Sequence, residues 1–233
     1  MRDLGPKGLS LISHHNFMHQ QSRSAFVVGA YYPALVAACA LGERILNHLI
    51  LDLRENFKSS RHYSKVRTKS SIADWTRSID MLSDWKILLP EAAENCRELE
   101  VLRHRSVHFN METYENLRED ALSALTLIGN IISNQFGYFG AQPWFIEGTP
   151  GAQFIRRDYE THAFVRTYLI PVSAFVGVNY GMENTGHGWV HLDYADYGEA
   201  ELSDEEFAGA FRRRDPCKVV TRAMIGAHRE ATA

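Results

Sequence analysis

An amphipathic run from Pro33 to Leu53 is the feature that most restricts how this chain can fold. Apolar residues recur there at three- and four-residue steps, whereas Glu43, Arg44 and Asn47 fall on the opposite side. This period places the apolar side chains on one face of an α-helix. Because such a face has to be covered by other elements, the run predicts a bundle of helices packed around it.

Two neighbouring segments extend the helical pattern. Residues 9–30 can form an earlier helix that packs against the central one. A later helix, with Trp75 on its apolar face, is expected after Ser71 and Asp74, whose spacing is typical of a capping box.

The pattern continues beyond this third helix. Pro90 breaks or restarts it, and a helical period then extends to Arg103. Asn110 is expected to cap the last helix, whose apolar stripe ends at Ile132. Because the connections are short, four or five antiparallel helices are expected over residues 1–140.

The composition changes after the bundle to glycine, proline, aromatic and β-branched residues. We interpret residues 141–212 as a smaller α+β appendage that favours short strands, although residues 164–172 also fit a helix kinked at Pro171. Residues 213–233 are interpreted as a tail whose last residues fray. The predicted fold class is therefore mainly α, an antiparallel four- to five-helix bundle with a C-terminal α+β appendage.

Composition excludes several classes of protein. The 45% hydrophobic and 23% charged fractions are those of an ordinary globular chain, and a net charge of -3 gives no overall attraction for nucleic acid. Three widely spaced cysteines without a CxxC pair argue against a disulfide framework and fit the cytoplasm. No signal peptide or membrane span is expected, because the longest apolar region is interrupted by Gly29 and Pro33.

The most basic stretch is residues 54–69, where six arginines and lysines accompany a single acidic residue, Glu55. Cations of this kind bind the phosphates of nucleic acids. A mobile charged loop has the same composition. The candidate RNA ligands in this stretch are Lys58, Arg61, Lys65, Arg67 and Lys69.

The densest group of reactive side chains is Arg103-His104-Arg105-Ser106-Val107-His108. Cleaving RNA without a metal requires a base for the ribose 2′-hydroxyl, an acid for the leaving 5′-oxygen and a cation beside the phosphorane. Histidine can donate or accept a proton near neutral pH, and arginine holds two phosphate oxygens at once. Arg103 and His108 are therefore the candidate catalytic residues.

This motif resembles the ribonuclease motif of the HEPN superfamily: an arginine, a polar residue, three more residues and a histidine, at the join of the last two helices of a four-helix bundle. The resemblance covers roughly residues 9–138. It implies a metal-independent endoribonuclease without a cofactor, of the toxin or phage-defence kind, acting in the bacterial cytoplasm. RNA and a second copy of the chain are the implied partners, and an antitoxin or another regulatory protein is a further one.

The resemblance also implies roles for single residues. In a homodimer, Arg103 and His108 of both copies would face one cleft and leave a 2′,3′-cyclic phosphate and a 5′-hydroxyl. His104 would orient the site, Glu43 would pair with Arg103, and Arg105 would bind a flanking phosphate. HEPN toxins that an antitoxin adenylylates carry a tyrosine two residues after the histidine, a position that is Asn110 here, so that form of regulation is not expected.

Three other interpretations remain open. Arg103 and His108 could be a solvated helix end whose charge suits the helix dipole. His104 and His108, four residues apart, could share a zinc ion, and His187 and His191 have the same spacing. The bundle could also be a non-catalytic HEPN module that holds a protein or nucleic-acid partner.

Overall fold

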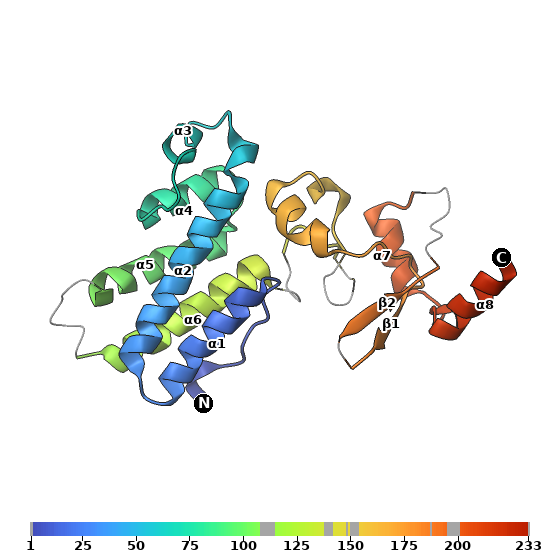
Figure 1. Cartoon of the computed structure of the whole chain (residues 1–233), viewed down its shortest axis with the longest axis horizontal. Coiled ribbons are helices and arrows are strands. Elements are labelled where there is room, and N and C mark those ends of the chain that lie inside the picture. Colours follow the sequence, from blue (N-terminus) through green and yellow to red (C-terminus); the bar gives the residue numbers. More distant parts are fainter. Residues whose placement is uncertain are drawn as a thin grey trace.

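The computed structural model describes residues 2–107, 115–137, 142–147, 149, 154–186, 188–194 and 201–232 of the 233. Within these residues the chain is mainly helical, with one short antiparallel hairpin near its C-terminal end, which confirms the predicted fold class. The helices up to residue 136 form a bundle, and the hairpin lies in the other part of the molecule, with the C-terminus beyond it (Figure 1).

Helix α2 (Tyr31–Leu53) is the centre of the bundle and begins two residues before the predicted start. It follows α1 (Ser13–Val27) after a tight turn, in which Gly29 has a φ of 82°. Helices α1, α4, α5 and α6 all pack on α2. The stretch Tyr31–Phe57 is long and apolar enough to cross a membrane by length and composition, but more than half of its 18-residue apolar window is buried by its neighbours in the bundle.

The three remaining bundle helices are α4 (Trp75–Asp84), α5 (Pro90–Val107) and α6 (Leu117–Phe136). Helix α5 begins at the predicted proline and continues beyond Arg103, which is the residue where the helical period was expected to end. The packing of α5 on both α2 and α6 places the motif arginine within the bundle.

The predicted helix caps were wrong. The carboxylate of Asp74 caps α4 by accepting a hydrogen bond from the Arg77 amide at 2.9 Å, so the cap lies three residues after Ser71. Helix α6 has Asn116 at its N-cap position, and Asn110 lies outside the described residues. Several polar residues have a high propensity for the N-cap position, and packing decides at which of them the helix begins.

Residues 54–69 form the turn η2 (Arg54–Phe57) and the short helix α3 (Tyr63–Val66) between α2 and α4. Arg54 holds this segment together, because its Nη1 donates to the carbonyl oxygens of Val66 at 2.8 Å and Lys69 at 2.7 Å. Phe57 stacks on Trp85, with ring centroids 4.5 Å apart. The basic segment is thus folded onto the bundle.

The chain after α6 begins by extending the core of the bundle. Trp144, Phe164 and Val165 are buried in the same hydrophobic cluster as the bundle helices. The region from Arg157 to Val172 is helical, formed by η5 (Arg157–Tyr159), the π-helical turn η6 (Val165–Leu169) and η7 (Ile170–Val172). The preference for strands was wrong here, and the alternative of a helical segment over residues 164–172 is confirmed.

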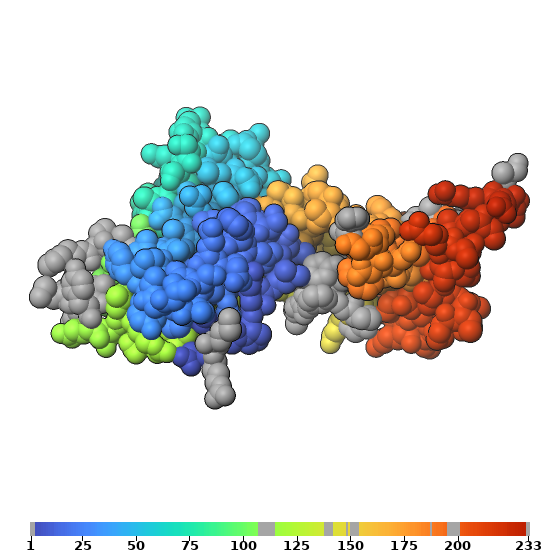
Figure 2. Space-filling view, turned by 60° about the horizontal axis from the view of Figure 1, so that its bottom comes forward, coloured from blue at the N-terminus to red at the C-terminus, as the bar shows by residue number. Residues whose placement is uncertain are grey.

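The C-terminal region contains the hairpin of β1 (Gly181–Asn184) and β2 (Trp189–Leu192), in which Gly181 pairs with Leu192. Helix α7 (Asp204–Arg212) follows, with a capping box formed by Ser203 and Glu206. The expectation of a frayed tail was wrong, because η8 (Pro216–Lys218) and α8 (Arg222–Thr232) occupy it. Figure 2 shows this end extending away from the bundle.

Replacing Gly42 with alanine is expected to destabilise the bundle by about 1–3 kcal/mol through overpacking. A methyl group there would lie 2.6 Å from Cη2 of Trp75 and 2.8 Å from Cδ2 of Leu99, both of which are buried. The measurement is urea unfolding at pH 7.5. The control is Gly226→Ala in α8, where an added methyl group would meet nothing within 4 Å; equal stability of the two variants would contradict the packing argument.

Candidate functional site

Arg103 is held between three helices of the bundle. Its Nη2 donates to Oε2 of Glu43 on α2 at 3.1 Å, and its guanidinium lies 5.6 Å from the ring centroid of Trp75 on α4. The Arg103 side chain is 20% exposed and that of Glu43 is 34% exposed. A charge-assisted hydrogen bond and a cation–π contact together fix the direction of the guanidinium. The structure thus contains the expected pairing of Arg103 with Glu43.

The second motif residue, His108, lies outside the described residues. The backbone remains helical as far as Val107, so the described part of the motif is the last turn and a half of α5. The meeting of Arg103 with His108, in one chain or between two, stays a prediction.

The two residues after Arg103 have different surroundings. Arg105 forms an ion pair with Asp120, whose side chain is only 7% exposed and which lies in the first turn of α6. This pair ties the end of α5 to the start of α6. His104 is exposed on the outer side of α5. A phosphate that binds Arg105 would have to compete with the Asp120 carboxylate.

The basic segment contributes to one wall of a broad, polar groove of about 800 Å³. The opposite wall comes from α4 and α5. Its lining residues are Arg61, His62, Lys65, Asp74, Thr76, Arg77, Asp80, Ser83, Asp84 and Arg97. Thr76, which lines the groove, donates to Glu100 of α5 at 2.9 Å, and Glu100 lies one turn before Arg103, so the groove comes near the site of Arg103.

Carboxylates of α4 and its cap neutralise most of the groove's arginines. Arg61 pairs with Asp84 at 2.6 Å, and Arg97 pairs with Asp80 at 2.9 Å. His62 also lies 2.7 Å from Asp84, and the hydrogen bond from His62 is the main reason why the pKa of this carboxyl is lowered. The positive balance of residues 54–69 is therefore reduced by acidic residues that lie elsewhere in the sequence.

The other candidate RNA ligands are at the surface. Lys58 pairs with Glu55 at 3.3 Å. Lys65, Arg67 and Lys69 are exposed and make no ion pair with any residue that the structure describes. A phosphate can approach these three cations without displacing a carboxylate of the described residues.

Sequence reasoning missed a group of histidines on α1. His15 and His19, one turn apart, are each 1% exposed. Burial lowers the pKa of His15 to about 3, with repulsion from His14 and His48 adding to the effect. Burial also lowers the pKa of His19 to about 4, and neither ring nitrogen of His19 makes a hydrogen bond of ordinary geometry. Their four-residue spacing on the buried face of a helix was the available signal.

A second missed feature joins α1 to α2. The rings of His14 and His48 contact edge to face, with centroids 5.1 Å apart. Burial, followed by the positive charges of His48 and Arg44, lowers the pKa of His14, whereas Asp52 opposes this. Tyr168 of η6 donates to Asp52 at 2.6 Å.

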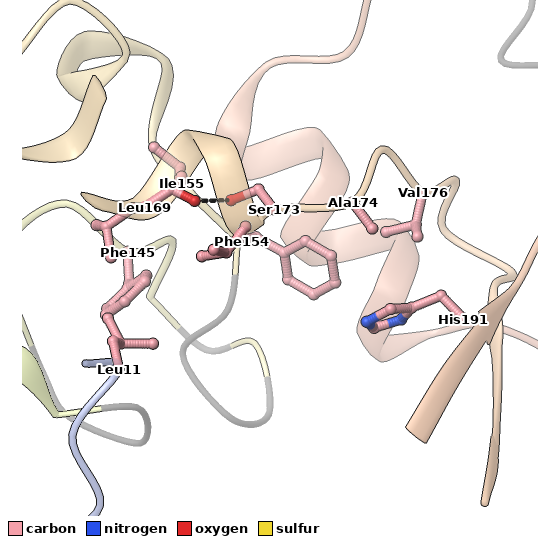
Figure 3. Close-up of a pocket in the computed structure, with 10 residues that line it drawn as sticks. Leu11, Phe145, Phe154, Ile155, Leu169, Ser173, Ala174, Val176 and His191 are labelled. Atoms are coloured by element: carbon pink, nitrogen blue, oxygen red, sulfur yellow. Dashed lines mark hydrogen bonds between the residues drawn. The ribbon is translucent and has the colours of Figure 1, made fainter. Parts of the chain in front are cut away.

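Two apolar cavities lie apart from the motif, where the C-terminal region meets the bundle. Figure 3 shows the smaller one, of about 80 Å³, with Leu11 and Phe145 at one end and His191 at the other. Within it, the Ser173 hydroxyl donates to the Leu169 carbonyl at 2.8 Å. The larger one, of about 400 Å³, lies against the start of α7. Neither is lined by a residue of the proposed ribonuclease site.

The described residues contain no group of three or more histidine, cysteine, aspartate or glutamate side chains placed to hold a metal ion. His108 and His187, which belong to the two histidine pairs noted in the sequence, lie outside these residues. Burial raises the pKa of the Cys39 and Cys96 thiols to about 12, so both stay protonated at neutral pH. Comparison of the chain with family models, with curated proteins and with solved structures gives no match.

Proposed function

We propose that this chain is a metal-independent endoribonuclease of the HEPN type, in which Arg103 and His108 of two copies form the active site. The observation that carries the proposal is the setting of Arg103, which Glu43 and Trp75 hold in place at the end of a bundle helix. A fixed guanidinium is suited to stabilise charge that develops in a transition state, since it needs no reorganisation during the reaction.

The Arg103 guanidinium retains hydrogen-bond donors that Glu43 does not use. A guanidinium has five N–H donors, and among the described residues Glu43 accepts one hydrogen bond from it. The remaining donors can bind the non-bridging oxygens of a phosphodiester. Glu43 also keeps the side chain from rotating away, which makes it a positioning residue in this proposal.

His108 would carry out proton transfer. One imidazole takes the proton from the ribose 2′-hydroxyl, whose oxygen then attacks phosphorus, and the P–O5′ bond breaks. A protonated imidazole from the second copy gives its proton to the leaving 5′-oxygen. The products are a 2′,3′-cyclic phosphate and a 5′-hydroxyl. A two-fold dimer supplies both imidazoles and both guanidiniums at one cleft.

The polar groove is the proposed path of the RNA backbone. Lys65 lies in it, and Arg67 and Lys69 follow in the same folded segment. An RNA phosphate can replace a carboxylate as the partner of Arg61 or Arg97, and binding would weaken as salt increases. Such an enzyme would act in the cytoplasm as a toxin or phage-defence effector, controlled by an antitoxin or another regulatory protein.

A non-catalytic module that binds a partner is the second candidate. The paired arginines of the groove favour it, because three ion pairs already satisfy those charges: Arg61 with Asp84, Arg77 with Asp74 and Arg97 with Asp80. In that case the bundle would hold a protein or nucleic acid without cleaving it.

Cleavage of labelled RNA in excess chelator tests the proposal. We expect cleavage to persist in chelator, to leave cyclic phosphate ends and to disappear in His108→Ala. Analytical ultracentrifugation of the same samples should show a dimer. A folded dimer that leaves the RNA intact would support the binding module, and cleavage that chelator abolishes would instead point to a metal bound at His104 and His108.

A further inference from the structure

The histidine cluster between α1 and α2 has no part in the proposed cleavage reaction. His14, in the first turn of α1, contacts His48 of α2 with ring centroids 5.1 Å apart. Arg44 and Asp52 lie four residues before and after His48, so they flank it on the same side of the helix. His14, Arg44 and Asp52 are exposed, and His48 is half-buried.

The cluster gathers groups that repel one another when charged. His48 and Arg44 both lower the pKa of His14, and His14 and His48 both lower that of the buried His15. The acidic group here is Asp52, which also accepts a hydrogen bond from Tyr168 of η6. Among the described groups that act on His14, up to three positive charges on His14, His48 and Arg44 therefore face one carboxylate, Asp52, which already accepts a hydrogen bond.

We propose that His14, His48 and Arg44 form a phosphate-binding site, which takes a phosphate monoester either free in solution or at the end of an RNA chain. A dianion supplies the charge that the cluster lacks. Arginine can hold two of its oxygens, and each imidazolium can donate a hydrogen bond to another. Binding would convert repulsion between these side chains into shared attraction to one ligand.

The surroundings of the cluster are consistent with an anion. Helix α1 has no acidic residue in its first turn, and its N-cap residue, Ile12, provides no side-chain hydrogen bond. The positive end of the α1 dipole therefore lies beside His14 without a negative group on its own helix. The inference does not depend on the proposed ribonuclease function, because it concerns binding at side chains outside the motif.

NMR titration of the full chain with inorganic phosphate at pH 6.5 and constant ionic strength tests the site. We expect the Cε1 proton signals of His14 and His48 to move towards their protonated positions and to saturate in the millimolar range, because a bound dianion favours the charged imidazoles. His228 of α8, which lies outside both the cluster and the polar groove, serves as the internal reference for phosphate binding elsewhere.

Substitutions show whether the cluster, and not general surface charge, binds the phosphate. Arg44→Gln should weaken phosphate binding about tenfold, as expected for the loss of one charge-assisted contact. Arg156→Gln, at an exposed arginine outside the cluster, should titrate as the parent protein does. Equal titration of Arg44→Gln and the parent, or shifts at His14 and His48 no larger than that at His228, would overturn the proposal.

Short RNA analogues show whether the ligand is a free phosphate compound or a phosphate at the end of an RNA chain. They carry 2′-O-methyl riboses, which cannot be cleaved by 2′-hydroxyl attack. Tighter binding of the 5′-phosphorylated form than of the 5′-hydroxyl form, lost in Arg44→Gln, would identify an RNA end as the ligand. Saturable binding of inorganic phosphate with no difference between the two RNA forms would identify a small phosphate compound. Because no cleavage is measured, failure here is distinct from failure of the ribonuclease proposal.

Discussion

Arg103→Ala is expected to lower the rate of RNA cleavage by a factor of about 100 to 1,000, the usual effect of removing one group that stabilises transition-state charge. Glu43 and the ring of Trp75 hold the Arg103 side chain in place. Single-turnover cleavage of a labelled RNA, with enzyme in excess and chelator present, measures this effect without a contribution from product release.

The control for Arg103→Ala is Arg118→Ala. Arg118 has the same two kinds of contact, an ion pair with Asp3 and a cation–π contact 5.6 Å from the Phe26 ring, but lies outside the proposed site. Its removal should leave the cleavage rate unchanged. Arg103→Lys should recover only part of the rate, because an ammonium cannot hold two phosphate oxygens in a planar fork. Equal rates for Arg103→Ala and the parent would remove the basis of the proposed mechanism.

Acidification from pH 7.5 to pH 5 is expected to reduce the free energy of unfolding by about 4 kcal/mol, since two buried histidines each contribute about 1.4 kcal/mol per pH unit below their ordinary pKa. Burial lowers the pKa of His15 to about 3 and that of His19 to about 4, from an ordinary value of 6.5. For a bundle with a typical stability of roughly 5–15 kcal/mol, this is a large fraction of the total.

The sign follows from proton binding. At pH 5 the unfolded chain binds protons at both imidazoles, whereas in the folded chain both remain neutral, so protons favour the unfolded state. Above pH 6.5, the stability that the neutral forms of His15 and His19 contribute to the folded state is fully present. It is lost as the pH falls to about 4 for His19 and to about 3 for His15. Urea unfolding at pH 7.5, 6 and 5 measures it.

His19→Leu should remove about half of this pH dependence. Leucine stays neutral at every pH, and the substitution leaves no partner without its hydrogen bond because the His19 ring nitrogens make none of ordinary geometry. The variant should therefore be at least as stable as the parent at pH 5. An unchanged loss of stability between pH 7.5 and pH 5 would show that His19 is not the group responsible.

The bundle could be predicted from the sequence because each of its long helices carries a continuous apolar stripe. The run that became α2 and the proline that begins α5 are local signals, and both were interpreted correctly. In the region from Arg157 to Val172, the preference for strands was wrong, while the helical alternative for residues 164–172 was right. Aromatic and β-branched residues suit a strand, whereas burial of Phe164 and Leu169 against the bundle favours helical turns. Packing of this kind depends on residues distant in the chain.

The candidate site was predictable only in part, for a similar reason. The pairing of Arg103 with Glu43 was expected from the resemblance to HEPN proteins, and the structure contains this ion pair. The ion pair between Arg61 and Asp84 could not be anticipated from the sequence, because Asp84 lies 23 residues further along the chain and becomes a neighbour of Arg61 only after folding. The sequence shows which charges are present, and tertiary structure decides which of them neutralise one another.

The two hydrogen bonds from Arg54 to the Val66 and Lys69 carbonyls have a consequence for RNA binding. A flexible loop loses conformational entropy when a ligand orders it, and this loss reduces affinity. Here the backbone that carries Lys65, Arg67 and Lys69 is ordered before any ligand arrives. Most of the attraction between these cations and a polyanion can therefore appear directly as binding free energy.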